Sequence, residues 1–157
     1  MPVQNLSLVL SDPDQTARRA ADLAARLQSG DVVLLSGDVG AGKTHFARAL
    51  IQSLMAYPED VPSPTFTLVQ TYDTQAGEIW HADLYRLTSI QEIEELGLTD
   101  AFDTAICLVE WPDRLGSLIP DDALEIELIS GSEPETRLAQ VRWTDTKWNN
   151  KVEPWTP

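Results

Sequence analysis

The feature that most constrains the fold is the segment 37–44, which reads Gly-Asp-Val-Gly-Ala-Gly-Lys-Thr. It matches the pattern G-x-x-x-x-G-K-[ST], in which the backbone N–H groups of a glycine-rich loop face phosphate oxygens. The apolar run 31–36 before it is typical of a buried strand, and residues 43–55 after it indicate a helix. The first turn of such a helix adds unpaired N–H groups and the positive end of a macrodipole. We therefore expect a strand–loop–helix unit that binds a nucleoside triphosphate.

The residues of this P-loop are all assigned to the nucleotide site. Lys43 is expected to pair with the β- and γ-phosphates, and the Thr44 hydroxyl is expected to ligate Mg²⁺. The alternative is a glycine-rich turn without a ligand, which the flanking strand and helix patterns disfavour. The expected nucleotide-contacting residues of the loop are Gly37, Asp38, Val39, Gly40, Ala41, Gly42, Lys43 and Thr44.

Two acids are candidates to complete the site, because hydrolysis also needs an acid at a strand end and a group that positions water. Glu110 ends the most apolar strand after the P-loop strand, and Asp83 ends the second strand of an expected hairpin. Each could instead be a solvated acid at a strand end. Thr65 follows a proline, so a stiffened loop could present its hydroxyl to Mg²⁺ or the γ-phosphate; alternatively, it only starts a strand.

The histidines and the cysteine carry weaker signals. His81 is either a structural residue or one that orients a phosphate or the loop, whereas His45 is expected on the surface of the P-loop helix. Neither histidine has a partner at metal-ligand spacing. Cys107, the only cysteine, lies in the apolar run 105–109 and is expected to be a buried core residue.

The remaining pattern indicates an α/β fold, P-loop NTPase-like, in which helices flank a central mixed β-sheet and a β-hairpin follows the P-loop helix. The hairpin is expected to have a long turn over residues 73–77. The expected helices cover residues 11–30, 43–55 and 89–97. The expected strands cover residues 31–36, 65–72, 78–83, 105–109, 124–129 and 137–143.

Length and charge limit the function further. A chain of 157 residues fits one domain, assigned here to residues 1–144, followed by a polar C-terminal tail, 145–157, whose Trp148 and Trp155 could dock on the domain or on a partner. With 11 Lys and Arg against 25 Asp and Glu, the net charge of −14 disfavours nucleic acid as a direct ligand. The nearest approach to a basic patch is a set of three arginines expected to form a solvated helix face: Arg18, Arg19 and Arg26.

The N-terminus has no basic segment followed by an apolar stretch, and no apolar run approaches the length needed to span a bilayer. These observations predict a cytoplasmic protein without a membrane anchor.

Four segments together resemble the bacterial TsaE family, the ATPases of tRNA N6-threonylcarbamoyladenosine biosynthesis. They are the P-loop at 37–44, Ser-Pro-Thr-Phe-Thr-Leu-Val at 63–69, His-Ala-Asp-Leu-Tyr-Arg-Leu at 81–87 and Val-Glu-Trp-Pro at 109–112. Their order matches the family from the first helix to about Trp143. One departure is Val39, where the family usually has Leu.

The resemblance implies Mg²⁺-dependent ATP binding, slow hydrolysis and association with the TsaB and TsaD proteins, which modify adenosine 37 of tRNA. tRNA would then be contacted only indirectly, through these partners. The catalytic residues would be Lys43, Asp83, Glu110 and Thr65.

The family pattern also places Thr44 and Glu110 around Mg²⁺, and Thr65 and Asp83 near the γ-phosphate. It further implies that Trp111 lies beside the site and that a late-strand arginine lies near the base; Arg137 is the match.

Two other classes remain open. A small-molecule kinase would carry several arginines that clamp the transferred phosphoryl group, and only four arginines follow the P-loop helix, none adjacent to another. A guanine-nucleotide switch would need the motif N-K-x-D, to which Asn150-Lys151-Val152-Glu153 is a near match that lacks an apolar strand before it.

Overall fold

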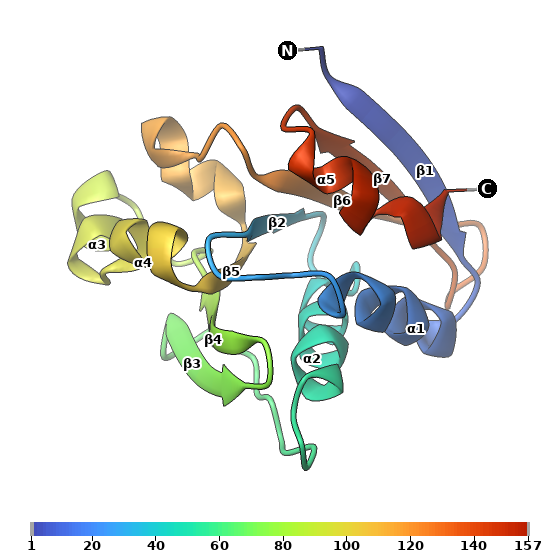
Figure 1. Ribbon diagram of the computed structural model, residues 1–157, viewed down its shortest axis with the longest axis horizontal. Helices are drawn as coiled ribbons and strands as arrows, with labels where there is room; N and C mark the ends of the chain where they lie inside the picture. The colour runs from blue at the N-terminus through green and yellow to red at the C-terminus, as the bar shows by residue number, and fades with distance from the viewer. Residues whose placement is uncertain (1, 157) are drawn as a thin grey trace.

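The computed structural model describes residues 2–156, which form a seven-stranded mixed sheet with helices on both faces (Figure 1). The strand order is β1-β7-β6-β2-β5-β4-β3. β2, β4, β5 and β6 pair with one another in parallel, while β1, β7 and β3 are antiparallel to their neighbours. The strands are β1 (Gln4–Leu10), β2 (Val32–Ser36), β3 (Val69–Thr74), β4 (Gly77–Asp83), β5 (Ile106–Glu110), β6 (Leu124–Ser130) and β7 (Arg137–Trp143). The helices are α1 (Pro13–Ala24), α2 (Lys43–Ser53), α3 (Ile90–Glu95), α4 (Leu98–Thr104), α5 (Lys147–Lys151) and two short 3₁₀ segments, η1 (Pro112–Leu118) and η2 (Glu153–Trp155).

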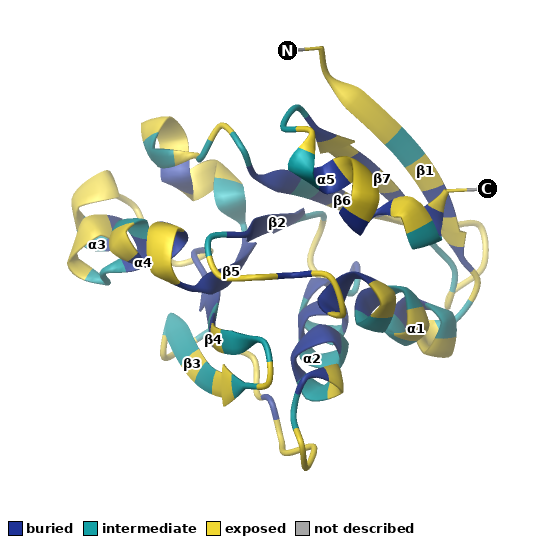
Figure 2. Ribbon diagram, viewed as in Figure 1, coloured by how far each residue is buried: buried dark blue, intermediate teal, exposed yellow. Residues whose placement is uncertain are grey.

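The central strand β2 shows why the middle of the sheet reads as a continuous apolar run. Val33 and Leu35 belong to the core that packs under α1 and α2, whereas Val32 and Leu34 belong to the core on the α3 and α4 side. Because both faces are covered, the residues Val32–Leu35 are all apolar, and only Ser36 at the end of the strand is polar. Figure 2 shows the result, with the central strands β2 and β5 buried and the outer faces of the helices exposed. The predicted mixed α/β fold is confirmed.

Cys107 on β5 is fully buried, as predicted, and removal from water raises the pKa of its thiol to about 12. The thiol therefore stays protonated at neutral pH and packs as a small apolar group. No helix in residues 2–156 is both long and apolar enough to cross a membrane.

The first helix is shorter than predicted. The Asp12 side chain accepts a hydrogen bond from the backbone N–H of Gln15 and starts α1, but the helix ends at Ala24 instead of continuing to residue 30. Leu27 is buried although it lies beyond the helix, so the apolar spacing continues where the backbone turns away. The three-residue spacing from Ala24 to Leu27 therefore predicted burial correctly but did not mean that the helix continues to Leu27.

The hairpin also differs from its prediction. Its first strand starts at Val69 instead of residue 65, because residues 64–68 form a turn that Leu68 closes by donating its N–H to the carbonyl of Pro64. Thr74 pairs with Gly77, so the loop contains two residues where a five-residue turn was expected. Gly77 has a φ of 111°, and its lack of a side chain makes the short turn possible. β1, α4 and α5 were not predicted from the sequence, although Leu6, Leu8 and Leu10 alternate along β1.

The C-terminal tail packs on the domain through two tryptophans. Trp148 on α5 is 0% exposed, and its indole N–H donates to the carbonyl of Asp122 at 2.7 Å. Trp155 is 3% exposed, meets the ring of Phe46 on α2 edge-on and donates its N–H to the carbonyl of Arg19. The question that the sequence left open is therefore answered: both rings dock on the domain.

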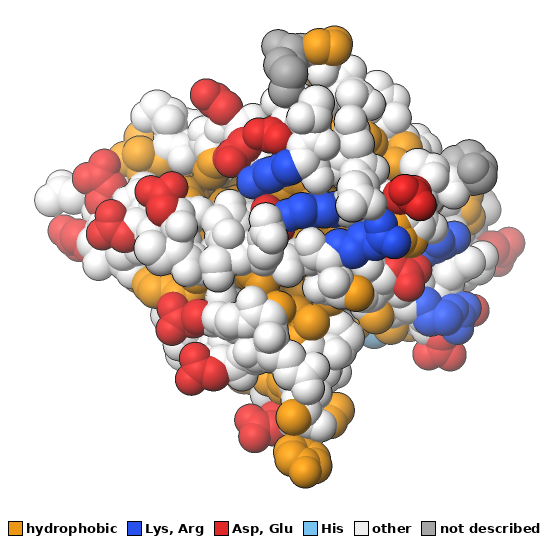
Figure 3. Space-filling model, viewed as in Figure 1, with side chains coloured by type: hydrophobic (Ala, Val, Ile, Leu, Met, Phe, Trp, Pro, Cys, Tyr) orange, Lys and Arg blue, Asp and Glu red, His pale blue; other side chains and the backbone are white. Residues whose placement is uncertain are grey.

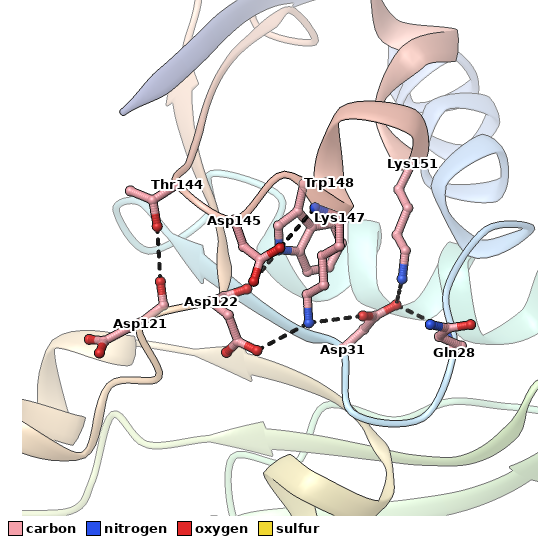
Figure 4. A network of polar contacts seen from close by, with 9 residues as sticks. All are labelled: Gln28, Asp31, Asp121, Asp122, Thr144, Asp145, Lys147, Trp148 and Lys151. Carbon is pink, nitrogen blue, oxygen red and sulfur yellow. Dashed lines mark hydrogen bonds and ion pairs between the residues drawn. The ribbon is translucent and has the colours of Figure 1, made fainter. Parts of the chain in front are cut away.

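A buried carboxylate anchors the same tail (Figure 4). Asp31, just before β2, is paired with Lys151 and lies 3.3 Å from the ammonium of Lys147, which is also 3.2 Å from Asp122. Burial acts to lower the pKa of Lys147, but the two carboxylates outweigh it and raise that pKa. Removing either partner of a buried pair leaves an uncompensated charge, so these contacts bind α5 firmly to the sheet.

Of the three arginines expected on a solvated helix face, Arg18 and Arg26 are exposed and Arg19 is half-buried, and Arg26 lies beyond the end of α1. Arg19 donates to the carbonyl of Pro154, and Arg26 donates to both oxygens of Asn150. Lys and Arg side chains do gather over α5 and α1 on the face shown in Figure 3. Since these contacts hold the tail, the cluster has a structural explanation and is no indication of a nucleic-acid site.

The buried tail generates a stability prediction. Trp148→Ala should lower the free energy of unfolding by about 3–5 kcal/mol, because it opens a large cavity and leaves the carbonyl of Asp122 without its donor. Urea denaturation followed by circular dichroism measures this. Tyr57→Ala is the control, since that ring is 85% exposed and its loss should change the free energy by less than about 0.5 kcal/mol. Similar denaturation midpoints for the two variants would contradict a docked tail.

Candidate functional site

The P-loop connects the C-terminal end of β2 to the start of α2, at the edge of the sheet where the parallel strands end. This is the edge at which ligands bind in open α/β sheets. A cavity of about 410 Å³ opens there. Its lining consists of Val39, Gly40, Gly42, Lys43, Thr44, His45, Ser63, Thr65, Asp83, Tyr85, Glu110 and Trp111.

The glycines of the loop are required by different features of the structure. Gly37 has a φ of 138°, and a Cβ there would lie 2.4 Å from the carbonyl oxygen of Leu128 at the end of β6. Gly40 and Gly42 have φ values of 81° and 102°, which side chains rarely adopt, although a Cβ at Gly40 would meet nothing within 4 Å. Gly42 also precedes α2, so its conformation turns the chain into the helix, whose start has no side-chain cap for its first N–H groups.

Lys43 is held inside the loop. Its ammonium donates to the carbonyls of Gly37 and Asp38, at 2.7 and 2.8 Å, and lies 4.3 Å from the centre of the Trp111 ring. Burial lowers the pKa of Lys43, while Glu110, Asp83 and Asp38 act in the opposite direction. The ammonium thus stands in the mouth of the loop among acceptors and has no carboxylate within salt-bridge distance among the described residues.

Thr44 and Glu110 meet directly. The Thr44 hydroxyl lies 2.9 and 3.1 Å from the two carboxylate oxygens of Glu110, and the same carboxylate lies 2.7 Å from Nε2 of the fully buried His81. The register explains the meeting, because Leu35 of β2 and Asp83 of β4 both pair with Glu110. The first turn of the P-loop helix is therefore joined to the ends of two neighbouring strands.

Asp83, the register partner of Glu110 on β4, also lines the cavity. Its Oδ1 accepts the backbone N–H of Tyr85 at 3.0 Å, and its Oδ2 lies 3.3 Å from the Thr65 hydroxyl. Ser63, in the same proline-rich segment, lies 2.7 Å from Thr65. These contacts bring the segment around Thr65 to the site, as the hydroxyl prediction requires.

Trp111 has the left-handed backbone conformation, with φ 59° and ψ 54°. For a bulky residue such a conformation costs about 1–3 kcal/mol and persists only where the surroundings impose it. The backbone N–H of Trp111 donates to the carbonyl of Leu35. Its indole ring packs against Tyr85, at 4.7 Å between ring centres, and against the ammonium of Lys43. The strained turn after β5 thus places an indole on the P-loop lysine.

Arg137 at the start of β7 lies on the other side of the loop. Its guanidinium donates to the carbonyls of Ala41 and Gly40, at 3.0 and 3.2 Å, and to those of Pro134 and Thr136. It lines a second cavity of about 210 Å³, which also contacts Ala41, Gly42 and His45. The side chain supports the P-loop backbone from behind, and its expected position near a base stays a prediction.

Most of the residues assigned from sequence meet in the larger cavity. Those that line it are Val39, Gly40, Gly42, Lys43, Thr44, Thr65, Asp83, Glu110 and Trp111. Gly37, Asp38 and Ala41 shape the loop without lining the cavity, and Arg137 contacts only its backbone.

Ser63 and Tyr85, which received no assigned role, line the cavity, and so does His45, which was expected only on the helix surface. His81, for which a structural and an orienting role were both open, contacts Glu110. Tyr85 lies two residues after Asp83, and His81 lies two residues before it, so the alternation of β4 places His81 and Asp83 on one face. That alternation could have linked His81 to Glu110, had the pairing of β4 with β5 been known.

A strand, a glycine-rich loop and a helix that together bring Lys, Thr and a strand-end acid to the carboxyl edge of a mixed sheet define the P-loop NTPase fold class. The sequence model of the family described as "Threonylcarbamoyl adenosine biosynthesis protein TsaE" matches residues 10–139. The chain therefore belongs to the TsaE family of tRNA threonylcarbamoyladenosine biosynthesis proteins, which confirms the resemblance inferred from sequence.

Individual relatives agree. The TsaE protein of Rickettsia bellii is 40% identical over 128 residues, which cover 82% of this chain and 89% of the relative. The TsaE protein of Bacillus subtilis is 34% identical over 128 residues, covering 81% and 79%. The crystal structure of B. subtilis YdiB matches with a TM-score of 0.77 at 26% identity and covers 98% of this chain and 95% of that chain.

The close approach at Gly37 generates a prediction with an internal control. Gly37→Ala and Gly40→Ala both force a side chain into a left-handed conformation, which costs roughly 1–2 kcal/mol. Only the Cβ at residue 37 would also collide with the Leu128 carbonyl. Gly37→Ala should therefore destabilise the protein by about 1–3 kcal/mol more than Gly40→Ala in chemical denaturation. Equal losses would show that β6 does not pack against the loop.

Proposed function

We propose that the chain is an Mg²⁺-dependent ATP-binding protein that hydrolyses ATP slowly and acts, through its nucleotide state, on the TsaB–TsaD pair in the threonylcarbamoyl modification of adenosine 37 of tRNA. The observation that carries the proposal is the convergence of Lys43, Thr44 and Glu110 at the N-terminus of α2. tRNA modification is work of the cytoplasm, where we propose that the protein acts.

The residues of the cavity fit a triphosphate. Gly40 and Gly42 have positive φ values, which are typical of loops whose successive backbone N–H groups form an anion-binding concavity. The Lys43 ammonium needs only to exchange its two carbonyl partners for phosphate oxygens. Such an exchange replaces neutral acceptors by anionic ones and is favourable. The start of α2 adds the positive end of a helix dipole.

The same residues fit Mg²⁺ only together with phosphates. Residues 2–156 contain no group of three or more His, Cys, Asp or Glu side chains that could hold a metal ion by themselves. Thr44 and Glu110 would contribute the protein's side of the site, because Mg²⁺ is commonly bound by one or two protein groups plus nucleotide phosphates and water. Mg²⁺ supplies positive charge that offsets the negative charge developing on the phosphates.

Asp83 and Thr65 are the proposed water-positioning groups. Asp83 is buried at the cavity wall, and its carboxylate already orders Thr65 and the backbone of Tyr85. A carboxylate has about four acceptor positions, so Asp83 retains capacity to accept a proton of an attacking water. Thr65 belongs to the segment between α2 and β3, whose exposed neighbour Phe66 offers a surface contact to a partner.

The positions of the arginines do not support the alternative that the chain is a small-molecule kinase. No arginine among residues 2–156 lines the cavity. Instead, Arg86 lies over the Phe66 ring and Arg114 donates to the carbonyl of Tyr85. Arg142 pairs with Glu125 on the sheet, and Arg137 supports the loop backbone. A phosphoryl-clamping set is thus missing from the described cavity.

The guanine-switch alternative fails on position. Lys151 of the Asn150–Glu153 near match is paired with Asp31, at the start of β2, whereas the P-loop leaves the other end of this five-residue strand. At about 3.3 Å per residue, Asp31 and Ser36 are roughly 16 Å apart. Asn150 accepts hydrogen bonds from Arg26, so this segment attaches the tail to the domain and is not positioned to bind a guanine base.

The proposal predicts that Lys43→Met weakens ATP binding at least about 10-fold, because charge-assisted hydrogen bonds to phosphate are lost. Titration with a fluorescent ATP analogue measures the affinity. Arg142→Met is the control, since it removes the same charge from a side chain paired with Glu125 on the exposed sheet. A wild-type protein that binds no ATP, or a folded Lys43→Met variant with unchanged affinity, would refute the proposed site.

The partner role predicts that affinity for the TsaB–TsaD pair depends on the nucleotide. A triphosphate that orders the segment around Thr65 should change this affinity by about 5- to 150-fold relative to ADP, the usual range of allosteric coupling. Calorimetry with an ATP analogue, ADP and no nucleotide measures the three constants. Lys43→Met should respond to neither nucleotide, and three identical constants for the wild type would remove the coupling.

A further inference from the structure

His81 is the buried end of a chain of side chains that leads to the cavity. It lies on β4 opposite Leu108 of β5, and Glu110 follows two residues later on the same face of the sheet. His81 is 0% exposed and does not line the cavity, whereas Glu110 and Thr44 do. The order from the core outward is therefore His81, Glu110, Thr44.

The chemistry of the three groups gives this chain a direction. As a carboxylate, Glu110 only accepts hydrogen bonds. His81 must then donate from Nε2, at 2.7 Å from Oε2. The Thr44 hydroxyl has one proton, which it directs at the same carboxylate, 2.9 Å from Oε1. Its two lone pairs are left for a ligand in the cavity.

The second ring nitrogen supports the same direction. Nδ1 of His81 is buried and has no hydrogen-bond partner among the described residues. A proton on Nδ1 would be an unsatisfied buried donor, which is costlier than an unused lone pair. The ring therefore carries its proton at Nε2, where the carboxylate accepts it.

We propose that His81 is a positioning residue which, by donating to Glu110, fixes the carboxylate so that the Thr44 hydroxyl keeps its lone pairs turned to the cavity for a divalent cation. The inference rests on the proposed function, since it concerns the cation that accompanies the nucleotide. Without the Nε2 donor, Glu110 could rotate and the Thr44 proton would no longer have a single direction. Groups that orient metal ligands in this way typically change metal affinity about 10- to 100-fold when removed.

The first test uses the Mg²⁺ dependence of nucleotide binding. His81→Leu should raise the Mg²⁺ concentration for half-maximal binding of an ATP analogue about 10- to 100-fold, while affinity measured in EDTA stays within about twofold. His81→Gln retains an N–H at the end of the side chain and should recover most of the Mg²⁺ response. Ile79→Ala, a buried residue two positions earlier on β4, controls for a general loss of packing.

The second test is made on the wild-type protein without bound nucleotide or Mg²⁺, and a variant serves only to identify the signal. A ¹⁵N–¹H correlation spectrum of the wild-type imidazoles should show the His81 proton on Nε2, and His81→Gln identifies the signal because His45 is the only other histidine. A proton on Nδ1 would overturn the proposal. So would a Mg²⁺ response in His81→Leu equal to wild type, or a shift equally large in Ile79→Ala. A wild-type protein that binds no nucleotide would refute the proposed function instead, and the position of the His81 proton could still be measured.

Discussion

The contact between the Thr44 hydroxyl and the Glu110 carboxylate is the interaction on which the site depends. It joins the first turn of α2 to the end of β5, which is the strand beside the one that feeds the P-loop. Because Leu35 and Glu110 are register partners, the loop and the acid start from adjacent positions. The glycines at 37, 40 and 42 then have to turn the chain within a short distance, and Gly37 does so against the Leu128 carbonyl.

This arrangement requires a rigid platform, which the sheet provides through its two cores. Successive residues of β2 belong to one core and then the other, so a shift in the register of this strand would expose apolar side chains. The C-terminal tail contributes to the α1 and α2 side, since Trp148 and Trp155 are part of that core. Trp155 contacts Phe46, three residues after Lys43, so the tail braces the helix that carries the P-loop.

The distribution of charge follows from the same contacts. Several of the few cations are engaged internally: Arg19 and Arg26 hold the tail, Lys151 neutralises the buried Asp31, and Arg137 supports the loop. The excess of acids therefore remains on the surface. A strongly negative surface disfavours direct contact with tRNA. A family that serves tRNA modification can still use such a chain if other proteins contact the nucleic acid.

The sequence by itself determined the P-loop, the α/β class and the family, because each signal is contiguous: a motif of eight residues, apolar runs of strand length and four short segments in a fixed order. It also indicated Glu110 and Asp83, since both end apolar strands. It did not determine where α1 stops, how short the hairpin loop is, or where Arg19 and Arg26 point. The tertiary structure alone decided these features and the pairing of His81 with Glu110. The contacts of Arg19, Arg26 and His81 join residues far apart in the chain, and they depend on the tertiary arrangement and on strand order and register, which local periodicity does not encode.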